Sequence, residues 1–446
     1  MTATDRADRP STPLTTKQLL ATHPGLRSWR FKVFAATWIA YASYYFVRQA
    51  LSVAKIGLLE EGSGFENVFT KPVLGVLDTV YLITYAGGQF LWGACADRFG
   101  TRIVVIGGFL TSIAAAFLMG LDPTVVAFGI ALGILGLGQS TGWAPLCKNV
   151  GNFFTVKERG RVLGLWSTNY AFGGLATVPF LTWLAYGVFD SWKVAFFGGA
   201  AVMALALLVF VALQRNSPES VGLPNLADAE RGATVPAPAA DRPAPARAEG
   251  SVLKTLRDPV VLTLGAAYFL LKPARYALLL WGPVLIVERL PDVDTVLAAS
   301  TLVAFGITGC AAPILIGFVS DKLFGSRRVP PAVLSLVLLA VATALFTPLT
   351  ASGSVVVMIL VLSFIGLAVY AADSMISCTA AVDFGKAEGA GTAAGVVNGC
   401  GSVGAILGGL LPGFLSANVL FYGFAGAALL AALIMLPRWN RVPATS

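Results

Sequence analysis

The sequence has few charged residues and a single histidine. Of its 446 residues only 12% are Asp, Glu, Lys or Arg, whereas a typical soluble domain carries about 25%. Hydrophobic residues make up 56% of the chain. This balance excludes an ordinary soluble enzyme, and it also excludes a disordered chain, which would be polar and highly charged. The composition therefore predicts a polytopic membrane protein.

The residue types that carry most enzyme chemistry are equally scarce. His23 lies in a polar N-terminal stretch, so histidine cannot act as a buried proton relay. None of the five cysteines forms a C-x-x-C pair, so neither a zinc site nor a disulfide framework is indicated. The sequence has no phosphate-binding G-x-x-x-x-G-K-[ST] loop and no Ser-centred nucleophile elbow. We therefore expect no metal, no cofactor and no enzymatic activity.

Apolar segments long enough to cross a bilayer follow one another along the chain, since a helical span needs about 20 mostly apolar residues. We place them at 31–52, 73–95, 103–121, 124–146, 162–186, 194–213, 260–287, 296–319, 330–349, 354–378, 390–413 and 418–436. This pattern predicts an all-α membrane protein with 12 transmembrane helices.

The spans fall into two six-helix halves. The stretch 214–256 is rich in Pro, Ala, Arg and Asp and has no hydrophobic period, which is typical of a flexible linker. The expected domains are an N-terminal segment, a first bundle, a linker, a second bundle and a tail, at residues 1–30, 31–213, 214–256, 257–437 and 438–446.

Orientation follows from the distribution of Lys and Arg among the short loops. The basic loops all fall on the side that carries both termini and the linker, while the alternate loops hold mainly Asp and Glu. Because Lys and Arg are retained on the cytoplasmic side, both termini should be cytoplasmic. The expected location is a bacterial-type inner (plasma) membrane, crossed many times.

A short motif occurs once in each half, after the second and the eighth span. It reads Gly-x-x-x-Asp followed by Arg or Lys, and its residues are Gly93, Asp97 and Arg98, then Gly317, Asp321 and Lys322. Two such loops in register with a 6+6 layout resemble the major facilitator transporters, which are built from parallel six-span repeats. We expect these loops to take part in the conformational change.

Two arginines lie inside predicted spans. Arg48 is near the end of the first span and Arg275 is well inside the seventh. An arginine at the centre of a span costs about 2.5–3.5 kcal/mol on insertion scales, so it usually faces a water-filled cavity or a partner; snorkelling to the headgroups is the alternative. The two occupy nearly equivalent places in the two halves, which would bring them together at the central axis. Paired guanidinium groups predict a bidentate oxyanion, such as phosphate or phosphonate.

Further ionisable and phenolic side chains lie near these arginines in the sequence. Lys272 is one turn from Arg275 and is either a third cation of the site or structural. Tyr44 is one turn before Arg48 and could orient it or bind the anion. Asp373, in the tenth span, is a candidate counter-ion, proton carrier or ligand for a substrate ammonium group.

The remaining polar residues at membrane depth have a structural interpretation by default. Asp78 lies towards the non-cytoplasmic end of the second span, where a structural role is favoured. For Gln89, Gln139, Asn169 and Asn398 the default is hydrogen bonding between helices, with pocket lining as the alternative.

Several segments resemble the organophosphate:phosphate antiporter family, which includes bacterial glycerol-3-phosphate and hexose-6-phosphate transporters. The matching segments are 44–49, 139–147, 157–160, 217–224, 275–276, 320–324 and 391–395. The resemblance implies exchange of an organic phosphate for inorganic phosphate by alternating access, without ATP. It also implies that Arg48 and Arg275 are the two phosphate-binding arginines.

The sequence departs from the glycerol-3-phosphate branch of that family at several positions. Tyr170 stands where that branch has a histidine, Gln89 replaces a lysine, and a glutamate is replaced near Gly306. Asp373 stands where familiar members have proline. The arginine pair is kept while the rest of the pocket is rebuilt. An added carboxylate beside a cationic site suits a zwitterion, such as an aminophosphonate or a phospho-amino compound.

Two other functions stay open. One is a proton-coupled carrier for another organic anion, for which Asp373 would be the titrating group. The other is a transporter-like sensor of phosphate esters, which would bind its ligand with little flux. The expected partners are a phosphorylated or phosphonate solute, inorganic phosphate and the lipid bilayer, with no nucleic acid, and the expected state is a monomer.

Overall fold

The computed structural model describes residues 16–154, 162, 165, 166, 168–226, 258–325, 327–380 and 390–440, and these are all helical or turn and loop. The helices of the first half are α1 (Thr16–Thr22), α2 (Pro24–Arg48), α3 (Ala50–Leu59), α4 (Lys71–Phe99), α5 (Thr101–Leu121), α6 (Val125–Ser140), α7 (Trp143–Asn152), α9 (Thr168–Thr182), η2 (Trp183–Val188), α10 (Lys193–Leu213) and η3 (Pro218–Val221). Those of the second half are α13 (Pro259–Val287), α14 (Thr295–Ser300), α15 (Val303–Leu323), α16 (Val329–Thr350), α17 (Val355–Ser374), η4 (Met375–Ala380), α19 (Ala390–Leu410), η5 (Leu411–Gly413), α20 (Ala417–Met435) and η6 (Leu436–Arg438).

The predicted all-helical, two-half architecture is confirmed. Among the described residues, ten helices are long and apolar enough to cross a membrane by length and composition. The two expected spans outside this set are the first, α2 with α3, and the second, α4. In the first of these, the break at Gln49 leaves α3 with only ten residues, and α2 carries Arg48; in the second, α4 carries Asp78.

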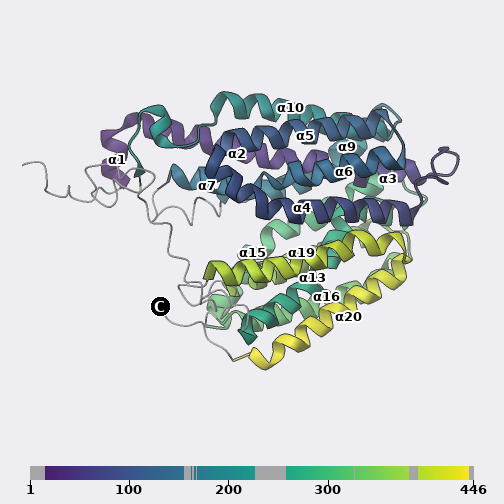
Figure 1. The fold of residues 1–446 in the computed structure, drawn as a ribbon. Helices are drawn as coiled ribbons and strands as arrows, with labels where there is room; N and C mark the ends of the chain where they lie inside the picture. Colours follow the sequence, from purple (N-terminus) through teal and green to yellow (C-terminus); the bar gives the residue numbers. More distant parts are fainter. Residues whose placement is uncertain are drawn as a thin grey trace, which may run out of the picture.

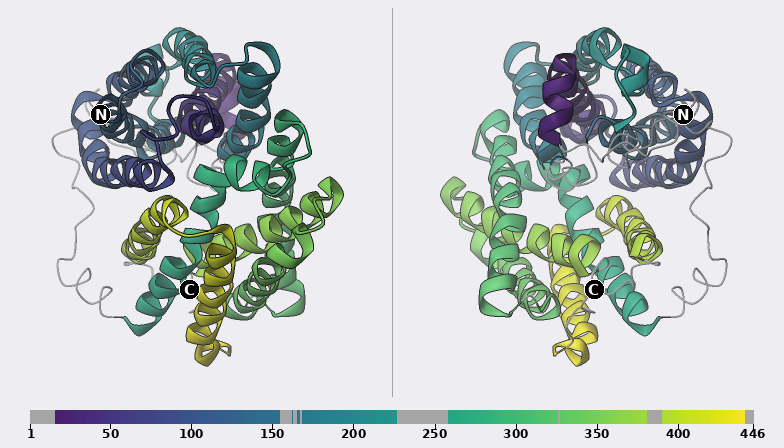
Figure 2. Two further views of the ribbon diagram at one scale, coloured as in Figure 1. Left: turned by 90° about the vertical axis from the view of Figure 1, so that its right-hand side faces the viewer. Right: turned by 90° about the vertical axis from the view of Figure 1, so that its left-hand side faces the viewer.

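The two halves lie one above the other in Figure 1, with α2–α10 in the upper half and α13–α20 in the lower half. We call the end at the left in Figure 1 the basic side. Arg98 and Arg102 lie at the junction of α4 with α5, and Lys322 lies at the end of α15. The opposite end, where α3 meets the loop to α4, is the acidic side, with Glu60 and Asp190. Figure 2 shows the two bundles from both ends. The expected linker, 214–256, is described only to residue 226, so its extent stays a prediction.

The first span is longer than the sequence predicted. Its helix breaks at Gln49, whose backbone leaves the helical region, and then continues as α3 to Leu59 instead of ending at residue 52. The ten residues of α3 add about 15 Å at 1.5 Å per residue. Arg48 therefore lies inside the span and not near its end. The prediction ended the span too early because an apolar segment that contains a single lysine still continues as helix.

The halves pack against each other through helices and helix segments towards the acidic side. α4 packs on α19 and η5, α3 packs on α13, and α9 packs on α14 and α15. The backbones of the two halves approach closely at Gly75 and Gly413. A β-carbon on Gly75 would lie 2.8 Å from the carbonyl oxygen of Leu410 and 3.2 Å from the Cα of Gly413. Glycine is required at this contact for steric reasons.

We predict that Gly75→Ala destabilises the contact between the halves by about 1–3 kcal/mol, because the added methyl group overlaps a backbone that cannot rotate away. Gly87→Ala, on the same helix, is the matched control, since a β-carbon there would meet nothing within 4 Å. Thermal unfolding of the purified proteins in detergent should show a lower Tm for Gly75→Ala and an unchanged or higher Tm for the control. Equal Tm values would contradict this account of the contact.

Candidate substrate site between the two halves

Arg48 is a buried guanidinium without a carboxylate partner in the described part of the chain. The residue is only 8% exposed. Its Nε donates to Oε1 of Gln139 at 3.3 Å, and its Cζ lies over the rings of Tyr45 and Tyr85, 4.7 and 5.0 Å from their centroids. The Nη2 group is buried and has no hydrogen-bond acceptor. A charged donor that is left unsatisfied in this way is a strong indication of a missing anion.

Arg275, on α13, has an anionic partner in Asp373 from α17. Its Nη1 is 3.0 Å from Oδ2 of that carboxylate. Lys272, one turn earlier, places its Nζ 3.7 Å from Oδ1 of Asp373. Tyr268 also donates its hydroxyl to Oδ1 at 2.8 Å, and Tyr370 lies beneath the Arg275 guanidinium at 4.6 Å. Asp373 is therefore a shared counter-ion for both cations of the second half.

Two tyrosines connect the arginine of the first half with that of the second. The ring of Tyr45, on α2, lies under the Arg48 guanidinium, and the ring of Tyr276, on α13, lies near the Lys272 ammonium; both phenols are near both arginines. Both guanidinium groups thus lie within reach of the same phenols. The placement of the two arginines beside a common symmetry axis stays a prediction.

The described site holds more positive than negative charge. Arg48, Arg275 and Lys272 supply three cations, and Asp373 supplies one carboxylate. The side chains of Lys272, Arg275 and Asp373 are 12–16% exposed, so solvent reaches them although they lie deep in the protein. A ligand with two negative charges would balance this site, because the two excess cations are held among apolar helices.

The predicted tyrosines occupy different positions. The hydroxyl of Tyr44 hydrogen-bonds to Oγ1 of Thr141 at 2.9 Å, within the first half, so this phenol already has a partner. Tyr170, half-buried on α9, lies near Arg275 and Asp373. Tyr170 therefore lies in the charged cluster. Tyr44 is one turn from Arg48 on α2, but its hydroxyl is bound to Thr141.

The two predicted amides lie at the margin of this cluster. Gln89 is half-buried on α4, one turn beyond Tyr85, whose ring faces Arg48. Asn398, on α19, is exposed and donates its Nδ2 to the carbonyl of Ser377 at 3.5 Å. Their roles as ligands stay predictions.

The loop residues of the repeated motif are described in part. Arg98 and Lys322 are exposed at the basic side and lie over the rings of Phe99 and Phe318. The surroundings of Gly93 and the side chains of Asp97 and Asp321 lie outside the described part of the chain. The expected role of these loops in the conformational change therefore stays a prediction.

Sequence reasoning missed a buried lysine. Lys55, on α3, is fully buried and forms an ion pair with Asp78 of α4. It was missed because the predicted first span ended at residue 52. The sequence also contained a pattern that pointed to this region. Tyr268, Lys272 and Tyr276 are four residues apart, so they share one face of α13.

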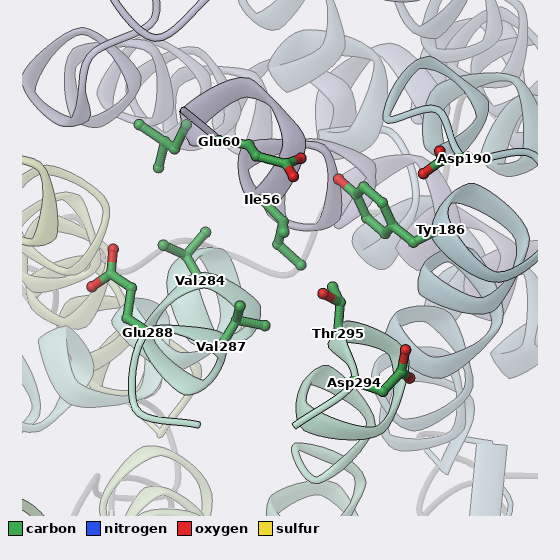
Figure 3. Close-up of a pocket in the computed structure, with 10 residues that line it drawn as sticks. Ile56, Glu60, Tyr186, Asp190, Val284, Val287, Glu288, Asp294 and Thr295 are labelled. Atoms are coloured by element: carbon green, nitrogen blue, oxygen red, sulfur yellow. The ribbon is translucent and has the colours of Figure 1, made fainter. Parts of the chain in front are cut away.

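A cavity of about 350 Å³ opens on the acidic side between the halves (Figure 3). Glu60, Asp190, Glu288 and Asp294 line it, and Tyr186 lies beside them. Within the described part of the chain, no three His, Cys, Asp or Glu side chains converge closely enough to hold a metal ion. The acidic lining also makes the cavity unsuitable as a resting place for an anion.

We predict that Asp373→Asn increases the thermal stabilisation of the protein by bound oxyanions. Without the carboxylate, Arg275 and Lys272 repel each other. The free energy of unfolding of the substrate-free protein should fall by about 1–3 kcal/mol, which lies between the contributions of surface and of buried ion pairs. Thermal unfolding should show a lower Tm and a larger gain in Tm on addition of phosphate at constant ionic strength. Glu288→Gln, which neutralises an exposed carboxylate paired with Lys71, is the control and should change neither value. An identical phosphate gain in wild type and Asp373→Asn would refute the shared counter-ion role.

Comparison with known proteins identifies the family of the chain. A family model described as the Major Facilitator Superfamily matches residues 37–409. The glycerol-3-phosphate transporter of Bacillus subtilis (strain 168) is 26% identical over 421 residues, covering 92% of each chain. The probable hexose phosphate transport protein of Chlamydia trachomatis is 28% identical, covering 92% of this chain and 91% of its own length. The membrane sensor protein UhpC of Escherichia coli (strain K12) is 28% identical and covers 93% of each.

A solved structure has the same fold. The crystal structure of a bacterial homologue of the human lysosomal transporter Spinster, in an inward-facing and unoccupied conformation, superposes with a TM-score of 0.68 at 13% identity. The match covers 92% of this chain and 95% of that one. The predictions of a multi-pass membrane transporter and of a chain that is not an enzyme are confirmed by the family. This chain belongs to the Major Facilitator Superfamily.

Proposed function

We propose that the protein imports a phosphorylated or phosphonate solute in exchange for inorganic phosphate, by alternating access around Arg48 and Arg275. The observation that carries this proposal is the buried Arg48, whose Nη2 has no acceptor and which has no carboxylate partner among the described residues. Such a group is costly to bury unless a ligand anion completes it. Relatives named as glycerol-3-phosphate and hexose phosphate transport proteins support the same class of substrate.

The two arginines would bind the anion in different ways. Arg48 is available to the anion directly, because its neighbours are Gln139 and aromatic rings. Arg275 already donates Nη1 to Asp373, so an anion that takes this group would compete with the carboxylate. The return of Asp373 to Arg275 would help release of the anion, since it restores a partner to the cation. A site that binds and releases the same anion with little net cost is suited to exchange.

The direction of the path follows from the loop charges. The basic side would be cytoplasmic, because Lys and Arg are retained there. In the described residues the halves pack through segments towards the acidic side, and with this orientation the conformation would be one closed on the non-cytoplasmic side. Rocking of the halves would then expose the arginines alternately to the two sides.

Exchange is tested by counterflow in proteoliposomes loaded with inorganic phosphate. We expect uptake of labelled phosphate esters or phosphonates that depends on the internal phosphate. Arg48→Lys and Arg275→Lys should each lower uptake at least about tenfold, because lysine keeps the charge but loses the planar fork that binds an oxyanion in a bidentate manner.

Arg289→Lys is the matched control for these variants. Arg289 follows α13, beyond its end, and contacts Asn418 and Thr347 far from the arginine pair, so its uptake should equal that of wild type. Undiminished exchange in both site variants would overturn the proposal. Uptake that follows a proton gradient and ignores internal phosphate would instead assign the chain to a proton-coupled carrier with Asp373 as the titrating group.

The organic part of the substrate is probed through Asp373. We propose that this carboxylate favours a zwitterionic substrate by interacting with its ammonium group. The matched pair is 2-aminoethylphosphonate and ethylphosphonate, which differ only by the amine. In competition with labelled substrate, Asp373→Asn should weaken inhibition by the aminated compound several-fold more than inhibition by the other. An equal change for both compounds would contradict an interaction between Asp373 and the ammonium group.

A sensor function is the second candidate, because one relative is named a membrane sensor protein. A sensor would bind a phosphate ester with little flux. It would therefore give a ligand-dependent rise in Tm in the same preparation that shows no counterflow.

A further inference from the structure

A lysine without any solvent exposure lies between the two halves. Lys55, on α3, is 0% exposed and forms an ion pair with Asp78 of α4. Its Nζ also donates to the carbonyl oxygen of Leu280, on α13, at 3.1 Å. The same ammonium lies 3.8 Å from the centre of the Trp281 ring. A buried ammonium is tolerated only when its hydrogen bonds and its charge are satisfied, and here a carboxylate, a carbonyl and an aromatic ring do so.

These partners come from both halves of the protein. Lys55 and Asp78 belong to the first half, whereas Leu280 and Trp281 belong to the second. Trp281 is held in place in turn, because its Nε1 donates to the carbonyl of Gly409 on α19 at 3.0 Å. The lysine therefore joins α3 and α4 to α13, and indirectly to α19, through directed polar contacts in an otherwise apolar interface.

The position of Lys55 along the path is defined by the helices. Lys55 is seven residues beyond Arg48, or about 10 Å along the axis, and Leu280 is five residues beyond Arg275, or about 7.5 Å. Both displacements are towards the acidic side. The neighbouring residues Ile56 and Val284 already line the acidic cavity. The lysine thus separates the arginine pair from the acidic cavity.

We propose that Lys55 and Asp78 form a latch that closes the path on the acidic side and that releases Leu280 and Trp281 whenever the path opens to that side. The latch rests on the alternating access proposed above. Opening would remove the carbonyl and the ring from the ammonium but would leave the bond to Asp78. Lys55 is thus paired in both states, while the closed state alone has the contacts with α13. Lys55 and Asp78 are positioning residues that bias the two conformations without touching the substrate.

The test removes both charges together, so that no unpaired charge is left in the interior. The variant is Lys55→Met/Asp78→Asn, studied as the full chain without substrate by hydrogen–deuterium exchange. We expect exchange to rise about tenfold at the acidic side, in 52–60 and 280–290, because a hydrogen bond from a charged donor is lost. At the basic side, in 96–104 and 316–325, exchange should fall, because opening one side closes the other.

The control removes another ion pair between the halves. Lys71 and Glu288 form such a pair at the exposed edge, with side chains 45% and 41% exposed, and exposed pairs contribute little. Lys71→Met/Glu288→Gln should therefore leave exchange unchanged at both sides. A change of equal size in the control would overturn the latch.

Opposite changes at the two sides separate a latch from a merely structural pair, which would raise exchange on both sides together. Lys55→Gln/Asp78→Asn keeps polar groups of similar size and should shift exchange in the same directions, but less. A uniform rise, no change, or failure of both variants to fold would assign the pair to the core and overturn the proposal. Because no substrate is added, these results do not depend on whether the counterflow experiment succeeds.

Discussion

The constraint on which the rest of this structure depends is the placement of cations among apolar helices. Arg48, Arg275 and Lys272 lie deep between two six-helix halves, and in the described residues one carboxylate, Asp373, faces them. Such charges are stable only with partners or water. Helices that would otherwise pack as a uniform apolar core are therefore organised around a site that an anion can complete.

This constraint also explains the layers along the path. Positive charge is concentrated at the arginines, a satisfied Lys55–Asp78 pair lies about two turns further on, and carboxylates line the cavity beyond. Contacts across the halves flank this path, such as the glycine backbone contact at Gly75 and the bond between Lys55 and the carbonyl of Leu280. A rigid-body movement of one half would change all of these contacts together, which is the mechanical requirement of alternating access.

The sequence was sufficient for the fold, since apolar length and loop charge are properties of local composition. It also found the arginine pair, because a charge inside a span stands out against apolar neighbours and the repeat supplied its counterpart. The sequence could not show that Asp373 bridges Arg275 and Lys272, because α13 and α17 are distant in the chain. Lys55 was missed because a span predicted from hydropathy stops before a charged residue. In the structure the helix continues through Lys55, whose charge has a buried partner in Asp78.

The most direct test of the central claim is a structure of the protein with bound inorganic phosphate. The account predicts that the anion lies between Arg48 and Arg275, with oxygens in hydrogen-bond contact with both guanidinium groups and with Asp373 displaced from Arg275. Phosphate that contacts neither arginine, or that binds while the Arg275–Asp373 ion pair stays intact and Nη2 of Arg48 stays without an acceptor, would contradict it.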